Sequence, residues 1–291
     1  MRPGWGMRDV GWVASRSHPT SPVPHLLWFL PFVAASCDPP PPGGAESDAG
    51  KFAFRAEQVP VGTAFHYVKS NIDGTQAIRV TVWVADTARI EVVKLEPEHG
   101  AGAFVTAHLD WATASADTIE SWIVSATAPR RPQVKAWLTA GGGFVAEIGG
   151  RRDTVSVGQF PVHVYNFDFL SLAQTFAHLR DPEGSFTIGV LNPVFADGPR
   201  LVSYDGPVTV RFDGEVPCHT ALCRRYTVSG PGLNGAAGAI RVHRERGHVE
   251  SIEVPVPDNP AWRDFKLELQ RVEPMDRAAW ERWVAEQIAQ L

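Results

Sequence analysis

The 291-residue chain has little cysteine, no excess of positive charge and no long apolar run. Its 3 cysteines are too few for a disulfide scaffold, and its composition lacks the strong bias of collagen, coiled coils and disordered chains. The net charge of −5 gives no electrostatic reason to expect a nucleic-acid partner, because such proteins usually carry a basic patch or stripe. These absences leave an ordinary globular protein, long enough for one large domain or two small ones.

Recognisable catalytic and metal-binding motifs are also missing. The sequence contains no GxSxG elbow, HExxH helix, P-loop or EF-hand loop, and its 10 histidines show no ligand pair at helical spacing. Residues 230–235, GPGLNG, match GxGxxG, but a strand-like segment follows where a dinucleotide site needs a helix, so we interpret them as a hairpin loop. We expect no metal and no cofactor. A hydrolase whose Ser, His and Asp come from distant positions stays open as a third functional hypothesis.

The N-terminal segment has the order of an export signal. Residues 26–35, LLWFLPFVAA, form an uncharged apolar stretch of signal-peptide length, and three arginines precede it. Small residues and then Cys37 follow, which resembles the lipobox of bacterial lipoproteins. We expect residues 1–36 to be a removed signal peptide that starts at Met1 or Met7, and we expect Cys37 to be lipidated. The alternative for this cysteine is an ordinary thiol.

A Pro- and Gly-rich stretch begins at the same cysteine. Residues 37–51 start with CDPPPPGG and have the composition of a flexible spacer, so we expect a tether between the lipid and the folded part. Loss of residues 1–36 removes three arginines and one aspartate, which makes the mature chain more acidic still. We therefore expect an exported protein, anchored to a bacterial membrane by its N-terminal lipid and facing mainly the periplasm, with no nucleic-acid partner.

The two remaining cysteines, Cys218 and Cys223, are expected to form a disulfide. An exported protein folds in an oxidising compartment, and the CHTALC spacing can close a small loop between strand ends. The alternative is a metal site with His219 between the two sulfurs. That site lacks a second ligand pair to complete four ligands.

Apolar and polar residues alternate with period two through most of residues 52–275. In residues 76–85, QAIRVTVWVA, the alternation places four apolar side chains on one face. Turn signals separate the candidate strands, among them DG at 205–206 and 213–214. We expect a mainly β protein with a single large curved antiparallel sheet, of the half-barrel or open-barrel kind. The other candidate strands are ARIEVVKLE, TIESWIVSA, QVKAWLT, GFVAEIG, DTVSV, FPVHVYNF, SFTIGVLN, PVTVRFD, RRYTVSG, GAIRVHRE, HVESIEVPV and DFKLELQRV.

Two segments have helical periodicity instead. In residues 169–180 apolar residues recur every three or four positions and Asp168 can cap the start, which predicts one inserted short helix of about three turns. Residues 276–291 repeat the pattern with Asp276 as the cap. We expect this C-terminal amphipathic helix to pack on or beside the sheet.

The densest polar and aromatic cluster is HVYNFDF at 163–169. One interpretation makes it the floor of a ligand pocket, with His163 and Tyr165 as polar contacts. The other places its aromatic residues in the core and uses Asn166 and Asp168 as turn and cap. The candidate pocket residues are His163, Tyr165, Asn166, Asp168 and Phe176.

A resemblance to known proteins covers roughly residues 60–275. It is carried by YNFDFLSLAQTFAHLRDPEGSF and by CRRYTVSGPGLNGAAGAIRVHRERGHVESIEVPVPDNPAWRDFKLEL, which resemble a group of uncharacterised exported bacterial proteins. The pattern is also similar to the half-barrel domains of the lipoprotein-localisation-factor type, in which a curved antiparallel sheet wraps around a helical lid and holds acyl chains. The resemblance implies this fold and an apolar cleft, and it carries over no catalytic residue.

Two functional hypotheses follow from these expectations. In the first, the protein is a lipid-anchored, non-enzymatic binding module whose sheet encloses a continuous apolar groove for a lipid or another hydrophobic ligand. In the second, it is a structural or protein-interaction component of the cell envelope, which docks another envelope protein through an exposed apolar patch of about several hundred Å².

Overall fold

A computed structural model describes residues 45–195, 198–218, 221–259 and 262–291. The expected signal peptide, the expected lipidation site Cys37 and most of the expected tether lie outside these residues. Within the described ranges, no helix is long and apolar enough to cross a membrane.

Most of the described chain belongs to two runs of consecutive antiparallel strands. The first run consists of β2 (Thr63–Ser70), β3 (Ile78–Val84), β4 (Arg89–Glu96), β5 (Ala101–Asp110), β6 (Ser115–Ser125), β7 (Ala128–Leu138), β8 (Gly143–Ile148) and β9 (Arg151–Ser156). The second consists of β12 (Ser185–Pro193), β13 (Val202–Pro217), β14 (Leu222–Ser229), β15 (Ala237–His243), β16 (Val249–Val254) and β17 (Phe265–Pro274).

Shorter elements precede and connect the two runs and end the chain. The short strands are β1 (Glu46–Ser47), β10 (Gln159–Phe160) and β11 (Val162–Val164). The helices are α1 (Leu170–Ala173) and α2 (Arg277–Ala289). The 3-10 turns are η1 (Ala49–Lys51), η2 (Ala56–Gln58), η3 (Pro97–His99), η4 (Phe176–His178) and η5 (Pro231–Leu233).

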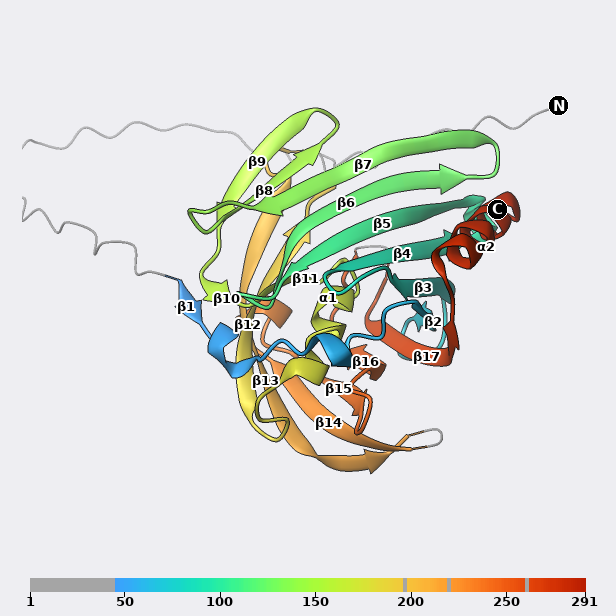
Figure 1. Ribbon diagram of the computed structural model, residues 1–291. Helices are drawn as coiled ribbons and strands as arrows, with labels where there is room; N and C mark the ends of the chain where they lie inside the picture. Colours follow the sequence, from blue (N-terminus) through green and yellow to red (C-terminus); the bar gives the residue numbers. More distant parts are fainter. Residues whose placement is uncertain (1–44, 196–197, 219–220, 260–261) are drawn as a thin grey trace, which may run out of the picture. The chain divides into compact units, whose positions relative to one another are not determined.

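The two runs join into one sheet because β17 pairs antiparallel with β2, and β11 adds the fifteenth strand at the edge beside β12. The strand order is β11-β12-β13-β14-β15-β16-β17-β2-β3-β4-β5-β6-β7-β8-β9, and only β11 and β12 pair in parallel. In Figure 1 the strands curve around α1, and the sheet is not closed into a barrel. The predicted fold class is therefore confirmed: a mainly β protein with one large curved sheet, a short inserted helix and a C-terminal helix.

Alternation within the strands divides the apolar residues between two clusters. Val80 and Val82 of β3 belong to the main core on the inner face, with α1. Trp83 lies on the outer face and belongs to a smaller cluster under α2. A period of two thus supplies both faces of the same strands with apolar side chains.

Within the 15-stranded sheet, the sequence pattern misses two strands, β2 and β5. Both faces of β2 are buried, since Phe65 packs into the main core while His66 contacts the ring of Trp283 on the other face. The alternation with polar residues that marks a half-buried strand is therefore absent. Strand β5 begins with Ala101, Gly102 and Ala103, and small residues of this kind are depleted in strands.

The DG pairs at 205–206 and 213–214 are not turns, as the sequence predicts, but lie inside the 16-residue strand β13. The pairing register shifts beside each of them. Gly206 has a φ of +117° and Gly214 a φ of +99°, values that other residues rarely adopt. The two pairs are β-bulges, which bend one long strand instead of ending it.

Replacement of Gly206 by alanine should destabilise the fold. Its φ is unfavourable for any side chain, and an added Cβ would lie 3.2 Å from the Cβ of Pro231. We expect Gly206→Ala to lower the free energy of unfolding in urea by about 1–2 kcal/mol. Gly50→Ala is the matched control, because nothing lies within 4 Å of an added Cβ there. Equal losses in the two variants would contradict the bulge explanation.

The segment expected to form a three-turn helix is mostly non-helical. It contains only the four-residue α1 and the turn η4. Asp168 and Phe169 adopt left-handed backbone angles, with φ of 57° and 52°, and no side chain caps α1. Nearly every residue from 167 to 179 is buried, so packing on the inner face overrides helical periodicity here.

Helix α2 covers the outer face of the first run. Asp276 caps it as predicted, accepting a hydrogen bond from the backbone of the first turn at 2.7 Å. Trp280 stacks on Trp83 with ring centroids 5.5 Å apart, and its indole N–H donates to Glu91 Oε2 at 2.8 Å. The predicted stripe of apolar residues on this helix is the face that packs.

The chain contacts the sheet before the expected start of the β domain. Strand β1 pairs in parallel with β10, and Lys51 Nζ donates to the carbonyl of Ser185 at 2.7 Å. These residues fall in the expected tether 37–51, so ordered contacts begin earlier than the sequence composition indicates.

Cys218 and Cys223 form the predicted disulfide, with Cα atoms 5.8 Å apart at the end of the β13–β14 pair. In the part of the chain that the structure describes, no group of three or more His, Cys, Asp or Glu side chains could hold a metal ion.

Candidate functional site

Four charged side chains meet on the inner face of the sheet. Lys69 comes from β2 and Lys94 from β4, while Asp168 precedes α1 and Asp258 follows β16. Lys69 Nζ lies 2.9 Å from Asp168 Oδ1 and 2.6 Å from Asp258 Oδ2, and Lys94 Nζ lies 2.6 Å from Asp168 Oδ2. Both carboxylates are fully buried. We call these four residues the buried charge cluster.

The pKa values of the cluster record a competition between burial and ion pairing. Burial opposes the charge of Lys69, but the carboxylates of Asp168 and Asp258 outweigh it and raise the pKa. Burial likewise opposes ionisation of Asp168, whose pKa is nevertheless lowered by Lys69 and Lys94. For Asp258 burial prevails, and with the nearby Asp168 carboxylate it raises the pKa to about 6. The cluster thus pairs two lysine ammonium groups with two aspartate carboxyl groups.

Two of the predicted pocket residues, His163 and Tyr165, have the contacts of core residues. His163 is fully buried with Nδ1 3.0 Å from Ser171 Oγ, and burial lowers its pKa to about 3. The Tyr165 hydroxyl donates to the carbonyl of Val256 at 2.5 Å, and its ring stacks on Phe169. Neither residue lines either of the two cavities described next.

A cavity of about 380 Å³ lies against the inner face of the first run. Lys69 and Lys94 line it, together with the ring of Trp262. We call it the sheet cavity. Neighbouring strands supply its apolar wall, which includes Ile78, Ala103, Val105, Ile119 and Val134.

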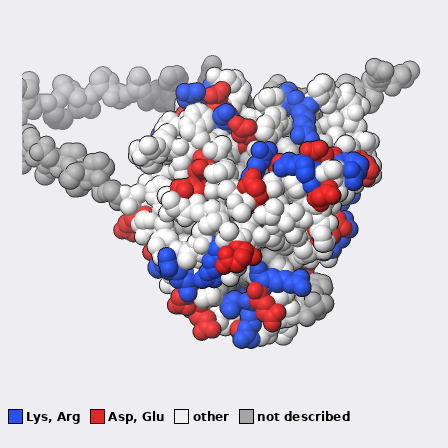
Figure 2. All heavy atoms as spheres, in the orientation of Figure 1, with Lys and Arg blue, Asp and Glu red and all other residues white. Residues whose placement is uncertain are grey.

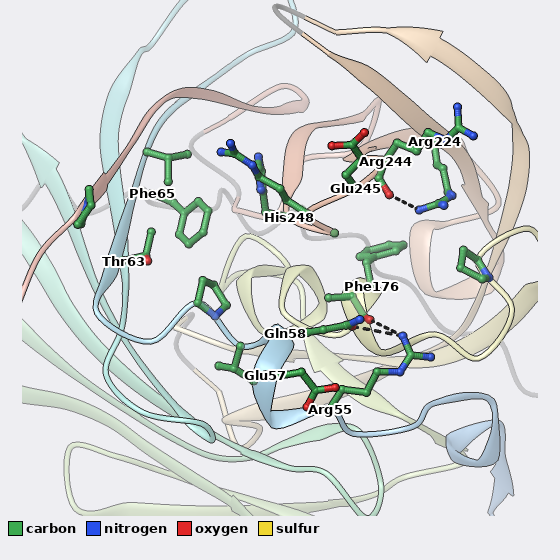
Figure 3. A pocket seen from close by; sticks show the side chains of 18 residues that line it. Arg55, Glu57, Gln58, Thr63, Phe65, Phe176, Arg224, Arg244, Glu245 and His248 are labelled. Carbon is green, nitrogen blue, oxygen red and sulfur yellow. Dashed lines mark hydrogen bonds between the residues drawn. The ribbon is translucent and has the colours of Figure 1, made fainter.

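A second cavity, of about 720 Å³, lies between β2, β17, η4 and the β15–β16 turn (Figure 3). It shares no lining residue with the sheet cavity. We expected a single continuous groove from the sequence. The structure has two separate cavities instead, and buried side chains of the core fill the inner face between them. We call the second cavity the arginine cavity. Its charged lining residues are Arg55, Glu57, Arg224, Arg244, Glu245 and Arg246.

The remaining predicted pocket residues belong to different places. Asn166 lines the sheet cavity, accepts a hydrogen bond from Lys94 Nζ at 3.0 Å and donates to the carbonyl of Asp258 at 2.9 Å. Asp168 is part of the buried charge cluster and not the predicted helix cap. Phe176 lines the arginine cavity. The structure thus brings Asn166 and Asp168 together around Lys94 and separates Phe176 from them.

Sequence reasoning missed the lysines and Asp258. Lys69 and Lys94 sit at positions where the alternation of β2 and β4 places core residues, next to Tyr67 and Val92 of the same parity. A lysine at an apolar position of a strand is the signal that would have found them, because such a charge needs a buried partner. Asp258 lies in a loop and carries no comparable signal.

A hydrolase would need a histidine bonded to a nucleophile in a cavity, and His163, which bonds to Ser171, lines neither cavity. Two other histidines have a carboxylate partner. His248 lines the arginine cavity with Nε2 2.9 Å from Glu250 Oε1, but no serine, threonine or cysteine side chain among the described residues bonds to it. His66 lies 3.0 Å from Thr81 Oγ1 and 2.8 Å from Glu273 Oε1, and it lines neither cavity. Neither arrangement presents a nucleophile to a cavity.

Comparisons with known proteins give matches among solved structures alone. No protein-family model matches the chain, and no curated protein matches it. Among solved structures, the chain is similar to one titled "Crystal structure of MucB", with 10% sequence identity and a TM-score of 0.24. The match covers 75% of this chain and 55% of that chain, so the chain spans about half the length of the protein it matches.

The low pKa of His163 should make folding stability depend on pH. A pKa of about 3 in the folded state, against 6.5 for the unfolded chain, means that the unfolded state takes up the proton first as the pH falls. The stability from neutral His163 is present above pH 6.5 and is lost progressively toward pH 3. As the pH falls from 7.5 to 5, protonation of this histidine in the unfolded chain should lower the free energy of unfolding by about 2 kcal/mol.

Urea unfolding of the parent protein and of His163→Asn at both pH values measures this contribution. Asparagine keeps an amide near the position of Nδ1 and does not titrate. Between the two pH values, we expect the free energy of unfolding of His163→Asn to fall by about 2 kcal/mol less than that of the parent protein. Identical pH dependence in the two proteins would show that His163 does not contribute.

Proposed function

We propose that the protein is a non-enzymatic binding module that holds an apolar molecule in the sheet cavity. The observation that carries this proposal is the apolar wall made by Ile78, Val105, Ile119 and Val134 from strands of one curved sheet. The volume of about 380 Å³ falls within the usual range of small-molecule sites. Curved sheets that stay open offer such hollows at their inner face.

The charges beside this cavity support an uncharged ligand. Lys69 and Lys94 line the wall, but Asp168 and Asp258 pair with them at 2.6 to 2.9 Å. Because each of the two ammonium groups is paired with a carboxylate, the cluster gives little attraction to an ion. Transfer of an apolar molecule onto the aliphatic wall is favourable in proportion to the apolar area removed from water.

The cell envelope is the proposed location, with the chain exported and held to the membrane by a lipid on Cys37. The support is the apolar stretch 26–35, the preceding arginines and the small residues before Cys37. The disulfide between Cys218 and Cys223 agrees with an oxidising compartment.

The alternative role, docking of another envelope protein, has less support from the surface. The large apolar side chains that are exposed in the described residues come from six separate segments. Phe195 lines the sheet cavity and Val272 lines the arginine cavity, so these two side chains belong to cavities and not to a flat docking face. The six are Phe54, Val61, Ile72, Phe195, Leu222 and Val272.

Filling the sheet cavity should abolish binding of an apolar probe. N-phenyl-1-naphthylamine fluoresces when it leaves water, and we expect a saturable increase in its emission with the parent protein. Ala103→Phe places a ring in the cavity and should weaken binding at least about tenfold, a change that corresponds to about 1.4 kcal/mol. Ala126→Phe, at an exposed position of the β6–β7 turn, is the matched control. Absence of saturable binding, or equal binding by both variants, would refute the proposed site.

Replacement of Cys37 should abolish membrane anchoring. In a bacterial host, we expect the parent chain to incorporate labelled palmitate and to sediment with membranes. Cys37→Ser should do neither, because the thiol that carries the lipid is gone. Ser36→Ala keeps a small residue before the cysteine and should behave like the parent. A Cys37→Ser chain that is processed and anchored like the parent would disprove lipidation.

A further inference from the structure

The arginine cavity carries positive charge that its surroundings do not neutralise. Four arginines and two glutamates line it, a formal excess of two positive charges in a chain whose net charge is −5. On the face shown in Figure 2, most basic side chains lie beside acidic ones. Elsewhere in the described residues, Arg225 pairs with Asp213 at 2.8 Å. Of the cavity's arginines, Arg244 alone has a carboxylate partner within the described ranges, Glu215 at 3.1 Å.

Carbonyl groups, rather than carboxylates, orient two of the other guanidinium groups. Arg224 Nη1 donates to the carbonyl of Arg244 at 2.6 Å, and its buried Nε has no partner in the described part of the chain. Arg55 donates to the carbonyls of Ala177 and Leu179 at 3.4 and 3.3 Å. Such contacts hold the side chains but leave their charge uncompensated.

The third guanidinium belongs to Arg246, on a closely packed turn. Gly247 has a φ of +71°, and an added Cβ there would lie 2.6 Å from the Cβ of Ala177 in η4. The backbone N–H of Arg246 donates to His243 Nδ1 at 3.2 Å. Its guanidinium makes no ion pair with any described residue, so a fixed turn presents an unneutralised charge to the cavity.

Part of the remaining wall of the cavity is apolar, beside the polar side chains of Gln58, Thr63 and His248. Phe65 of β2, Phe176 of η4 and Val272 of β17 line this part. In Figure 3 the ring of Phe176 lies near the labelled arginines, and the ring of Phe65 lies on the opposite side of the pocket. Phe176 is held in place by Tyr226, with ring centroids 5.0 Å apart. A cavity of about 720 Å³ with one basic and one apolar wall matches a molecule that has both properties.

We propose that the arginine cavity binds an anionic amphiphile, a molecule with a phosphate or carboxylate head on an apolar body. The head is held by Arg55, Arg224 and Arg246, because a guanidinium group can donate two parallel hydrogen bonds to such an oxyanion. The body lies against Phe65 and Phe176. This site is separate from the sheet cavity and adds a second ligand, of different charge, to the protein.

Calorimetric titration with three probes tests the assignment. Decyl phosphate carries head and body, decyl glucoside has the same body with an uncharged head, and inorganic phosphate has the head alone. We expect decyl phosphate to bind one site at least about tenfold more tightly than either of the others, and less tightly as salt is raised. Equal binding of decyl glucoside would overturn the role of the arginines. Equal binding of inorganic phosphate would overturn the role of the apolar wall.

Substitutions at exposed positions locate the site without disturbing the core. Arg246→Gln should weaken decyl phosphate binding about tenfold, while Arg282→Gln on α2 removes the same charge outside the cavity and should have little effect. Val272→Asp adds a negative charge to the wall and should weaken binding more than its neutral match Val272→Asn. Equal affinities across these pairs would refute the site.

A further variant separates this proposal from the sheet cavity. Ala103→Phe fills the sheet cavity and should leave the affinity for decyl phosphate unchanged. If it instead removed decyl phosphate binding, the anionic ligand would belong to the sheet cavity and the assignment to the arginine cavity would be wrong.

Discussion

The buried charge cluster is the interaction on which the arrangement of the inner face depends. An ionised group that leaves water without a partner costs several kcal/mol, so Lys69 and Lys94, placed on the inner face by their strands, require carboxylates beside them. Asp168 and Asp258 meet that requirement from outside the first run of strands. Their pairing fixes where the chain passes after β11 and after β16, and with it the position of α1.

The same cluster explains why the inserted helix is short. A helix over 169–180 would use the Asp168 carboxylate to accept backbone N–H groups at its start. Two ammonium groups compete for that carboxylate, and a bond between two charged groups is stronger than one to a neutral amide. Asp168 then adopts a φ of 57°, a conformation that aspartate tolerates better than most residues, and regular helix begins only at Leu170.

Sequence reasoning succeeded where one local rule acts alone. Period-two alternation identified β3 and β4, Asp276 identified the start of α2, and the spacing of Cys218 and Cys223 identified the disulfide. It failed where distant segments decide the outcome. Strand β2 has no exposed face, because α2, some 200 residues later in the chain, packs against its outer side.

The candidate sites were predicted less well than the fold, for the same reason. Asn166 and Phe176 do line cavities, but their sequence neighbourhood does not contain the lysines or arginines that define those cavities. Likewise, a DG pair marks a hairpin or a bulge depending on which strand lies beside it. The local sequence pattern predicts the strands and helices, whereas the residues that line each cavity are brought together by pairing between distant strands.

The position of the arginine cavity follows from the way the sheet is assembled. The two runs of strands meet at the pairing of β17 with β2, which joins residues about 200 positions apart. Phe65 and Val272 of that seam line the cavity, Phe176 comes from the segment between the runs, and Arg224 and Arg246 come from the second run. The second run supplies Val272 and these two arginines, but Phe65 and Phe176 come from outside it. The cavity therefore forms only when the seam has closed, and binding at this site depends on completion of the whole sheet.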